Sequence, residues 1–441
     1  MIGIVVSRAD SASEHVGEHL LSLLEWDERE DDGRPEAAGG GTVYRSGPFE
    51  LRTFEELHLH LDGVAEAFGD PDLVAFASRH SGETGPLLTA HFPGNFGPAE
   101  YGGEDHAVSQ GAPAALDRVA EAFDDYAPPE YAVAIECTHH GPTDVGAPTL
   151  FVELGSDDKQ WADPDGAEAV ARAILALDGV AVGSGRTVVG FGGGHYVPRF
   201  DRIRRETDWQ VGHVGADWAL SEVRDFEKHR DLLRAAFERS GGAHAVLDGD
   251  LPDLAAVLAD MDYRVVSETW VRETDGVPLD LVGDVEDTIG TVDDGLRFGD
   301  AVDVAPPDVT TVDLPDDLLA AALAADGDRT REAVAGALVA YDTEEGGTRP
   351  QGRAVVRSPA DVTVLVDRLA SVLATDYETV EVREDAVVAT ESAFDPDRAR
   401  EYGVEPGPAF GRLAEGETVE VDGELVRPAD VTAERTVRFE L

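Results

Sequence analysis

The chain has 441 residues, a hydrophobic content of 42% and a formal charge of −55, from 90 acidic and 35 basic residues. This composition supports packed cores in two or three domains and excludes wholesale disorder. No apolar run approaches the roughly 18–20 residues that span a bilayer, and residues 1–7 resemble a first strand more than a signal peptide. We therefore expect a cytoplasmic protein with no membrane partner. The single cysteine, Cys137, excludes an intrachain disulfide.

The acidic residues are spread along the chain between apolar positions, and Lys159 and Lys228 are the only lysines. Such a pattern is typical of a folded protein in molar salt, where a Debye length of about 3 Å screens self-repulsion. The alternative is an ordinary acidic protein. Acidity argues against charge-driven binding of nucleic acid, and we expect no DNA partner. Any RNA would be bound through shape and specific contacts.

Short β-rich runs alternate with helical patterns through the first two-thirds of the chain. The expected strands are residues 2–7, 73–78, 132–137, 149–154, 187–191 and 243–247. The expected helices are residues 11–24, 54–68, 113–126, 166–177, 221–240 and 252–261. The acidic, glycine-rich segment 27–41 fits an exposed loop or hairpin. This alternation favours an α/β domain with a mostly parallel sheet and helices on both faces.

The character of the sequence changes after Glu273, because no histidine follows His244 and no tryptophan follows Trp270. We expect a first domain over residues 1–273 and a C-terminal α+β extension over residues 274–441, joined through the acidic stretch 283–294. Expected helices of the extension are residues 316–325, 329–340 and 359–375. Its expected strands are residues 379–382, 386–390, 417–421 and 436–440.

Histidines recur at or beyond the ends of the expected strands of the first domain. Five motifs hold them: His80, His91, His139 with His140, His195, and His213. Because ligands bind at the carboxyl ends of strands in open α/β sheets, these side chains are expected to converge on one crevice. Imidazoles and carboxylates gathered there can bind zinc with one open position, which activates water for attack on an ester carbonyl.

Each of these features also has a structural interpretation. His80 or His213 alone is typical of a hydrogen-bonded structural histidine, and a glycine triplet is usually a turn. The bare backbone of Gly193 and Gly194, beside His195, can also approach a ligand and hold a phosphate or an oxyanion. Cys137 fits a small buried residue better than a nucleophile. We expect structural roles for His15, His19, His58, His60, His106, His229 and His244.

Basic residues cluster near the glycine triplet in an otherwise acidic chain. They are Arg186, Arg199, Arg202, Arg204 and Arg205. Arginines in such a patch bind phosphates well. The alternative is that they pair with nearby acids such as Asp201 and Glu206.

With these motifs in place, residues 1–272 resemble the archaeal and plant type of D-aminoacyl-tRNA deacylase. The blocks that carry the resemblance are residues 75–81, His91 with 94–97, 101–103, 138–143, 151–156, 192–196 and 212–213. The resemblance implies hydrolysis of the ester between a D-amino acid and the 3′ adenosine of tRNA. It also implies a zinc cofactor, a monomer, and a fold similar to peptidyl-tRNA hydrolases and nucleoside phosphorylases. Cys137 departs from the family pattern, which has alanine there.

The hypothesis from sequence is therefore metal-assisted deacylation. The expected zinc ligands are His80, His91, His139 and His195, with His140 and Glu136 in reserve. Glu136 or Glu153 is the expected general base, and the backbone of Gly193 and Gly194 with the Asn95 side chain is expected to stabilise the oxyanion. The expected substrate contacts are Ser78, Arg79, Arg199, Arg202, Arg204, Arg205 and His213.

Two other functions remain open at this point. A zinc amidohydrolase of a small N-acyl amino acid would use the same ligands without the arginines. A non-catalytic RNA- or nucleotide-binding module would need no metal.

Overall fold

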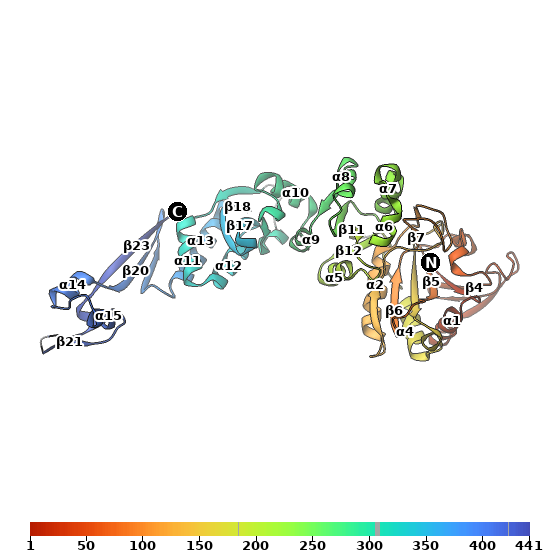
Figure 1. The fold of residues 1–441 in the computed structure, drawn as a ribbon, viewed down its shortest axis with the longest axis horizontal. Coiled ribbons are helices and arrows are strands. Elements are labelled where there is room, and N and C mark those ends of the chain that lie inside the picture. The colour runs from red at the N-terminus through yellow and green to blue at the C-terminus, as the bar shows by residue number, and fades with distance from the viewer. Residues whose placement is uncertain (184, 305–308, 422) are drawn as a thin grey trace. The chain divides into compact units, whose positions relative to one another are not determined.

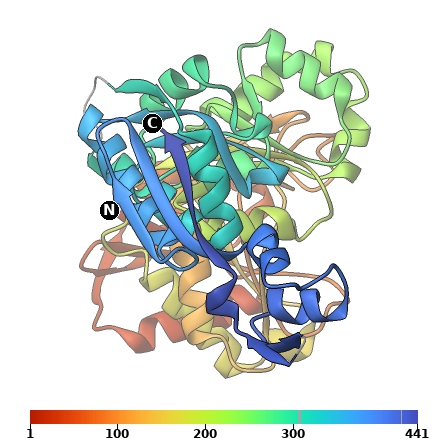
Figure 2. The same ribbon diagram turned by 90° about the vertical axis from the view of Figure 1, so that its left-hand side faces the viewer.

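The computed structural model describes residues 1–183, 185–304, 309–421 and 423–441. The chain divides into two compact units, Met1–Asp275 and Gly276–Leu441, which run from red to green and from green to blue in Figure 1. Figure 2 shows the same elements after a quarter turn.

The first unit contains an eight-stranded mixed sheet in the order β2-β3-β4-β1-β5-β10-β6-β9. Its strands are β1 (Ile2–Ser7), β2 (Asp27–Asp31), β3 (Gly41–Ser46), β4 (Phe49–Phe54), β5 (Leu73–Arg79), β6 (Leu87–His91), β9 (Ala132–Ile135) and β10 (Thr149–Gly155). Strands β4, β1, β5 and β10 are parallel, whereas β6 is antiparallel to β10 and parallel to β9. The sheet is therefore mixed: the expected parallel pairing holds at its centre and between β6 and β9, whereas β2–β3, β3–β4 and β10–β6 are antiparallel pairs.

The central strands are buried along nearly their whole length, as expected for a sheet covered on both faces. Helices α1 (Ser11–Leu23), α2 (Pro113–Tyr126) and α4 (Pro164–Leu175) pack on it. The short helix α3 (Asp158–Trp161) lies in the chain between α2 and α4. Val74, Phe76 and Phe151 pack instead against Phe54 and Phe68. Here the cover is a short 3₁₀ helix, η2 (Val64–Ala67), instead of a long α-helix.

A second, separate sheet of the first unit is four-stranded and parallel, in the order β12-β11-β13-β14. Its elements are β11 (Arg186–Gly192), α5 (Pro198–Glu206), β12 (Trp209–Gly215), α6 (Asp217–Val223), η3 (Phe226–His229), α7 (Arg230–Glu238), β13 (His244–Asp248), α8 (Pro252–Asp260), β14 (Arg264–Val266) and α9 (Glu268–Glu273). Val189 and Phe191 pack with α6, α7 and α8. Gly190 faces the opposite side of the sheet, where a Cβ would lie 2.6 Å from the ring of Phe200 on α5. Helices thus cover both faces of this sheet.

Two long helices expected from sequence are wrong. Residues 54–68 end β4 and then form η1 (His58–His60) and η2, separated by Gly63 at a φ of 68°. Residues 221–240 break into α6, η3 and α7, because Arg224 adopts a φ of 54°. The segment 27–41 forms β2 and the turn of a hairpin with β3. Strands β3, β4, β6 and β12 were not expected, nor was the small hairpin of β7 (Gly94–Asn95) and β8 (Ala107–Val108).

The second unit is α+β, with antiparallel sheets in the orders β15-β17-β18-β16, β19-β20-β23 and β21-β22. Its strands are β15 (Arg297–Phe298), β16 (Thr310–Asp313), β17 (Ala340–Glu344), β18 (Arg349–Val356), β19 (Thr379–Val382), β20 (Ala386–Phe394), β21 (Val419–Val421), β22 (Glu424–Val426) and β23 (Thr432–Glu440). Its α-helices are α10 (Leu279–Thr288), α11 (Asp316–Ala325), α12 (Gly327–Ala335), α13 (Pro359–Leu373), α14 (Pro396–Glu401) and α15 (Pro408–Ala414).

The expected linker 283–294 is instead largely helical, because Val282 and Val285 bury one face of α10. The expected helix 329–340 ends early, since Gly336 caps α12 and Ala340 begins β17.

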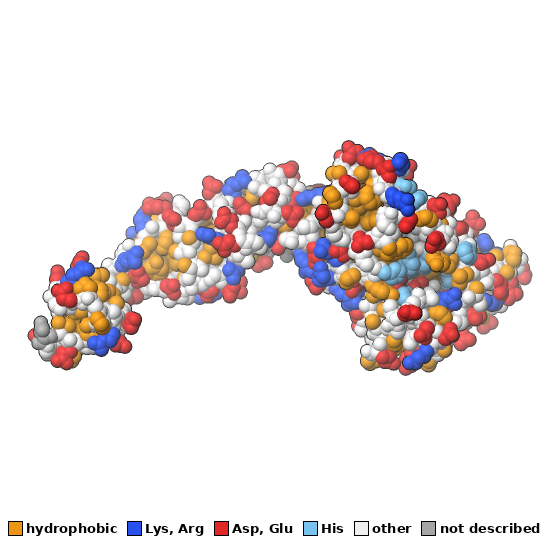
Figure 3. Space-filling view, viewed as in Figure 1, with side chains coloured by type: hydrophobic (Ala, Val, Ile, Leu, Met, Phe, Trp, Pro, Cys, Tyr) orange, Lys and Arg blue, Asp and Glu red, His pale blue; other side chains and the backbone are white. Residues whose placement is uncertain are grey.

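Acidic side chains are scattered over the visible surface of both units (Figure 3). We predict that the free energy of unfolding, and with it the melting temperature, rises steeply between about 0.1 M and several molar KCl, because salt screens this repulsion. Thermal melts followed by circular dichroism measure the effect. Sucrose is the control, since it favours burial without screening charge. A melting temperature that does not change with KCl concentration would contradict the expectation of salt adaptation.

Candidate active site

Five histidines from separate segments of the first unit lie around one centre. His80 directly follows β5, His91 is the last residue of β6, His139 and His140 lie in the loop after β9, and His195 follows β11. The ring centroids of His91 and His139 are 4.1 Å apart, those of His139 and His195 are 4.8 Å apart, and those of His80 and His195 are 6.5 Å apart. Figure 3 shows histidine side chains gathered in a hollow of this unit.

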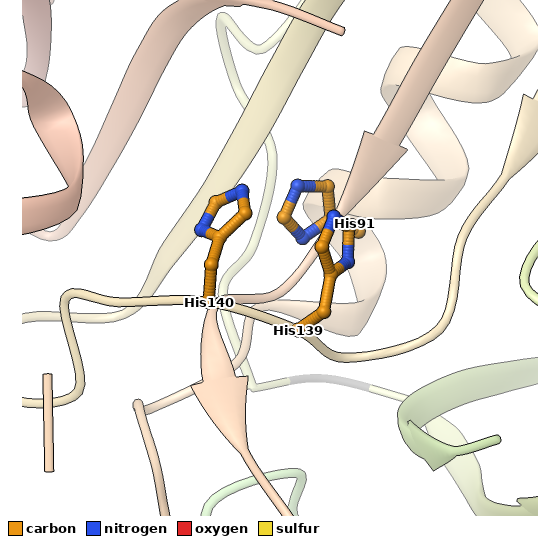
Figure 4. A group of neighbouring side chains, drawn as sticks. All are labelled: His91, His139 and His140. Carbon is orange, nitrogen blue, oxygen red and sulfur yellow. The ribbon is translucent and has the colours of Figure 1, made fainter. Parts of the chain in front are cut away.

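The first group of possible metal ligands is His91, His139 and His140, whose ligand atoms lie within 4.8 Å of one another (Figure 4). The Nδ1 atoms of His139 and His140 lie 2.9 and 2.8 Å from backbone carbonyl oxygens, and Nδ1 of His91 lies 3.2 Å from one. A carbonyl oxygen can only accept, so each Nδ1 carries the proton and each Nε2 keeps a free lone pair. This is the usual arrangement of metal-binding histidines.

The second group is His80, Glu136 and His195, and Glu136 also joins a third group with His91 and Glu153. Oε1 of Glu136 lies 3.2 Å from Nε2 of His80, and its Oε2 lies 3.4 Å from Nε2 of His195. Glu153 approaches His91 from the other side, with 3.5 Å between Oε1 and Nε2. Glu136 follows the end of β9 directly, and Glu153 lies within β10.

Several buried atoms of this cluster lack hydrogen bonds. Among the described residues, neither oxygen of Glu136 nor Nε2 of His91 has a hydrogen-bond partner. Buried polar atoms are nearly always satisfied, so such atoms call for an explanation. A metal ion held by carboxylate and imidazole ligands would satisfy them, and the donor set suits zinc.

The protonation states of His139, His140 and Glu136 suit metal binding. Burial, followed by neighbouring imidazoles, lowers the pKa of both His139 and His140 well below the ordinary value, so both are neutral. Burial opposes ionisation of Glu136, but His195 and the imidazoles around it lower its pKa to about 2. Contacts with Cys137 and then Glu136 raise the pKa of His195 to about 10. His139, His140 and Glu136 are therefore already in the forms that bind metal, whereas His195 would have to release its proton first.

A cavity of about 360 Å³ opens beside the cluster. Ser78 and Arg79, expected to contact substrate, line it together with His80, His139, His140, His195 and Glu153. The guanidinium of Arg79 lies 5.1 Å from the ring centre of Trp161, and its backbone N–H donates to Asp10. The structure thus brings three of the four expected ligands and two expected substrate contacts to one cavity, while His91 lies buried behind the cavity wall.

Several residues of this cavity were missed from sequence. Asp10, His58 and Tyr101 line it, and His58 was expected to be only structural. The hydroxyl of Tyr196 lies 3.2 Å from Nε2 of His80, and Oγ of Ser156 lies 3.2 Å from its Nδ1. Tyr101, Ser156 and Tyr196 belong to the sequence blocks that carry the family resemblance, which is the signal that could have singled them out.

The arginines of the expected phosphate-binding patch form ion pairs with acidic side chains. Arg202 forms a two-point ion pair with Glu268, Arg205 pairs with Asp124 and Asp201, and Arg199 lies 3.1 Å from Asp248. The side chain of Arg204 is only 2% exposed and pairs with Asp201 at 2.7 Å, so it cannot present itself to a phosphate. The interpretation as paired surface charges therefore fits better than a phosphate site.

His213, expected to contact substrate, does not line the cavity. It is fully buried, with Nδ1 3.0 Å from Oγ1 of Thr138 and Nε2 2.8 Å from the carbonyl oxygen of Ser109. Burial lowers its pKa to about 4. His213 supports the loop that carries His139 and His140 from beneath.

The expected oxyanion donors do not line this cavity. At Gly193 a Cβ would lie 2.6 Å from the carboxylate of Asp248, so this glycine lets the loop after β11 pass the end of β13. Gly194 is likewise absent from the cavity wall. Asn95 lines a neighbouring hollow, where its amide donates to the carbonyl oxygens of Gly102 and Glu104.

Within the described residues, the helices are too short or too polar for a membrane span.

The model of the D-aminoacyl-tRNA deacylase family matches residues 67–264. Relatives of that name include one from Natronomonas pharaonis, 53% identical over 440 residues and covering 100% of both chains. Another, from Methanococcoides burtonii, is 32% identical over 99% of this chain and 95% of its own.

A solved structure of a conserved protein of unknown function is 26% identical, with a TM-score of 0.55, and the match covers 62% of this chain and 98% of that one. This match supports the mixed α/β architecture. Because the Natronomonas relative matches end to end, the second unit shares this ancestry. The chain belongs to the D-aminoacyl-tRNA deacylase family.

Proposed function

We propose that this protein hydrolyses the ester that joins a D-amino acid to the 3′ adenosine of tRNA, releasing free amino acid and tRNA. The observation that carries the proposal is the cavity bounded by His80, His139, His140, His195 and Glu153, with imidazoles anchored through Nδ1 and unsatisfied buried oxygens behind them. Membership of the family supplies the substrate class. A monomer in the cytoplasm, where aminoacyl-tRNA is found, belongs to the same proposal, as does a fold like that of nucleoside phosphorylases and peptidyl-tRNA hydrolases.

Zinc is the proposed cofactor. His91, His139 and His140 would hold one ion, and His80, Glu136 and His195 offer a second set of ligands beside it. When bound, zinc polarises a carbonyl and supplies a water nucleophile at neutral pH. The chain's own residues position the ester in the cavity, where Ser78 and Arg79 are the proposed contacts.

Glu153 is the better of the two candidates for general base. Glu136 has a pKa near 2 and lies among three imidazoles, so it suits a ligand more than a proton acceptor. Glu153 lines the cavity and touches only one of the clustered imidazoles, that of His91. It can take a proton from the attacking water as the ester carbonyl is attacked.

The substrate is tested directly with D-tyrosyl-tRNA and L-tyrosyl-tRNA in molar KCl. We expect release of D-tyrosine and no release of L-tyrosine above the uncatalysed rate, because the proposed substrate is the ester of the D-amino acid alone. Acid precipitation of labelled aminoacyl-tRNA measures both rates. Equal turnover of the two substrates, or none, would rule out the proposed function.

The metal is tested with His139→Ala. This variant should lose bound zinc and at least about 100-fold in kcat/KM, because it removes a ligand outright, whereas loss of an outer-shell partner typically costs 10–100-fold. Zinc is measured by mass spectrometry on purified protein. His19→Ala, on α1 and outside the cavity, is the matched control and should keep both properties. Full zinc content in His139→Ala would remove this residue from the ligand set.

The general base is tested by comparing Glu153→Gln with Glu136→Gln. Glu153→Gln should lower kcat by about 10²–10⁴ while zinc stays bound, since only proton transfer is lost. Glu136→Gln should release zinc. If Glu153→Gln loses the metal, or Glu136→Gln keeps it, the two roles are exchanged or shared.

A further inference from the structure

A second hollow of the first unit shares His139 with the first cavity. Its volume is about 390 Å³. Ligand pockets fall in this size range. One molecule could therefore place one part in each hollow with the bond between them beside His139.

Trp218 on α6 is the principal apolar surface of the second hollow. It is 52% exposed, whereas its helix is held by buried Ala219, Leu220 and Val223. Trp209 and Trp270 are each 1% exposed. A large indole kept at the surface by a well-packed helix is a face against which a planar ligand can stack.

The charges of this hollow favour a neutral ligand with hydrogen-bond donors. The two charged side chains that line it, Glu100 and Glu222, are both acidic. Carboxylates accept hydrogen bonds from amino and hydroxyl groups and repel phosphates. Gly97 lets this wall approach α6, since a Cβ there would lie 2.9 Å from Cβ of Glu222.

We propose that the second hollow holds the terminal adenosine of the substrate, with its base stacked on Trp218 and its amino or ribose hydroxyl groups facing Glu100 and Glu222. The aminoacyl part then lies in the first cavity, and the ester lies at His139. This inference rests on the proposed function, because that function defines a substrate with an adenosine on one side of the ester. Trp218 is a binding residue and takes no part in proton transfer.

The test uses Trp218→Ala, Trp218→Phe and Tyr126→Ala. Tyr126 is a 46% exposed aromatic residue at the end of α2 that lines neither hollow, so it is the matched control. Isothermal calorimetry with adenosine in molar KCl gives a Kd without any need for turnover. Base stacking on an aromatic residue corresponds to about a 5- to 150-fold change in affinity. We expect Trp218→Ala to weaken adenosine binding by this factor, Trp218→Phe to recover most of it, and Tyr126→Ala to leave it unchanged.

Hydrolysis of D-tyrosyl-tRNA supplies the second measurement. Trp218→Ala should raise KM by a similar factor with little change in kcat, and its zinc content should equal that of the wild type. Unchanged adenosine binding in Trp218→Ala would overturn the proposal, as would a selective loss of that binding in Tyr101→Ala, which alters the first cavity. If the wild type binds adenosine through Trp218 yet hydrolyses no D-tyrosyl-tRNA, the proposed function fails and the adenosine site stands.

Discussion

The buried carboxylate of Glu136 is the constraint on which the site depends. It is 3% exposed, and Nε2 atoms of His80, His139 and His195 lie 3.2–3.6 Å from its oxygens. An isolated buried carboxylate costs several kcal/mol, so its charge must be compensated. The protonated ring of His195 supplies one positive charge, while burial keeps His139 and His140 neutral. A cation bound among these groups would take the place of the proton on His195 and give the orphaned oxygens a partner.

The backbone brings this carboxylate to the place where the two sheets of the first unit meet. The N–H of Cys137 donates to the carbonyl oxygen of His195 at 2.8 Å, and that of Thr138 to Val214 at 2.8 Å. These bonds tie the loop after β9, which belongs to the large sheet, to β12 and the loop after β11, which belong to the small one. The N–H of Gly94 donates to the carbonyl oxygen of His140 and fixes the far end of the loop. Candidate metal ligands from both sheets are thereby held together by main-chain hydrogen bonds.

The sequence was sufficient to predict that the histidines lie near one another, because the topology brings polar residues at strand ends together. The ion pairs of the arginines could not be predicted, because their partners Asp124, Asp248 and Glu268 are distant in the chain. It also could not assign His213, since a histidine that supports a loop and one that faces a cavity follow strands in the same way. The prediction of a helix over residues 54–68 was wrong, because the apolar residues of this segment belong to the end of β4 and to a 3₁₀ helix that covers the sheet. The split into two sheets depends on strand pairing, which periodicity does not specify.

The acidic surface and the proposed adenosine site have a common physical basis. In molar salt a Debye length of about 3 Å weakens contacts between arginine and phosphate, and the arginines near the site are already paired with acids. Stacking of a base on an indole depends on contact area and shape, and salt screening does not diminish it. An enzyme of this composition would therefore gain more from one exposed tryptophan beside its candidate metal ligands than from a row of surface cations. On this reasoning, the proposed recognition of the substrate in molar salt depends on its terminal base more than on its phosphates, and Trp218 is the residue proposed to bind that base.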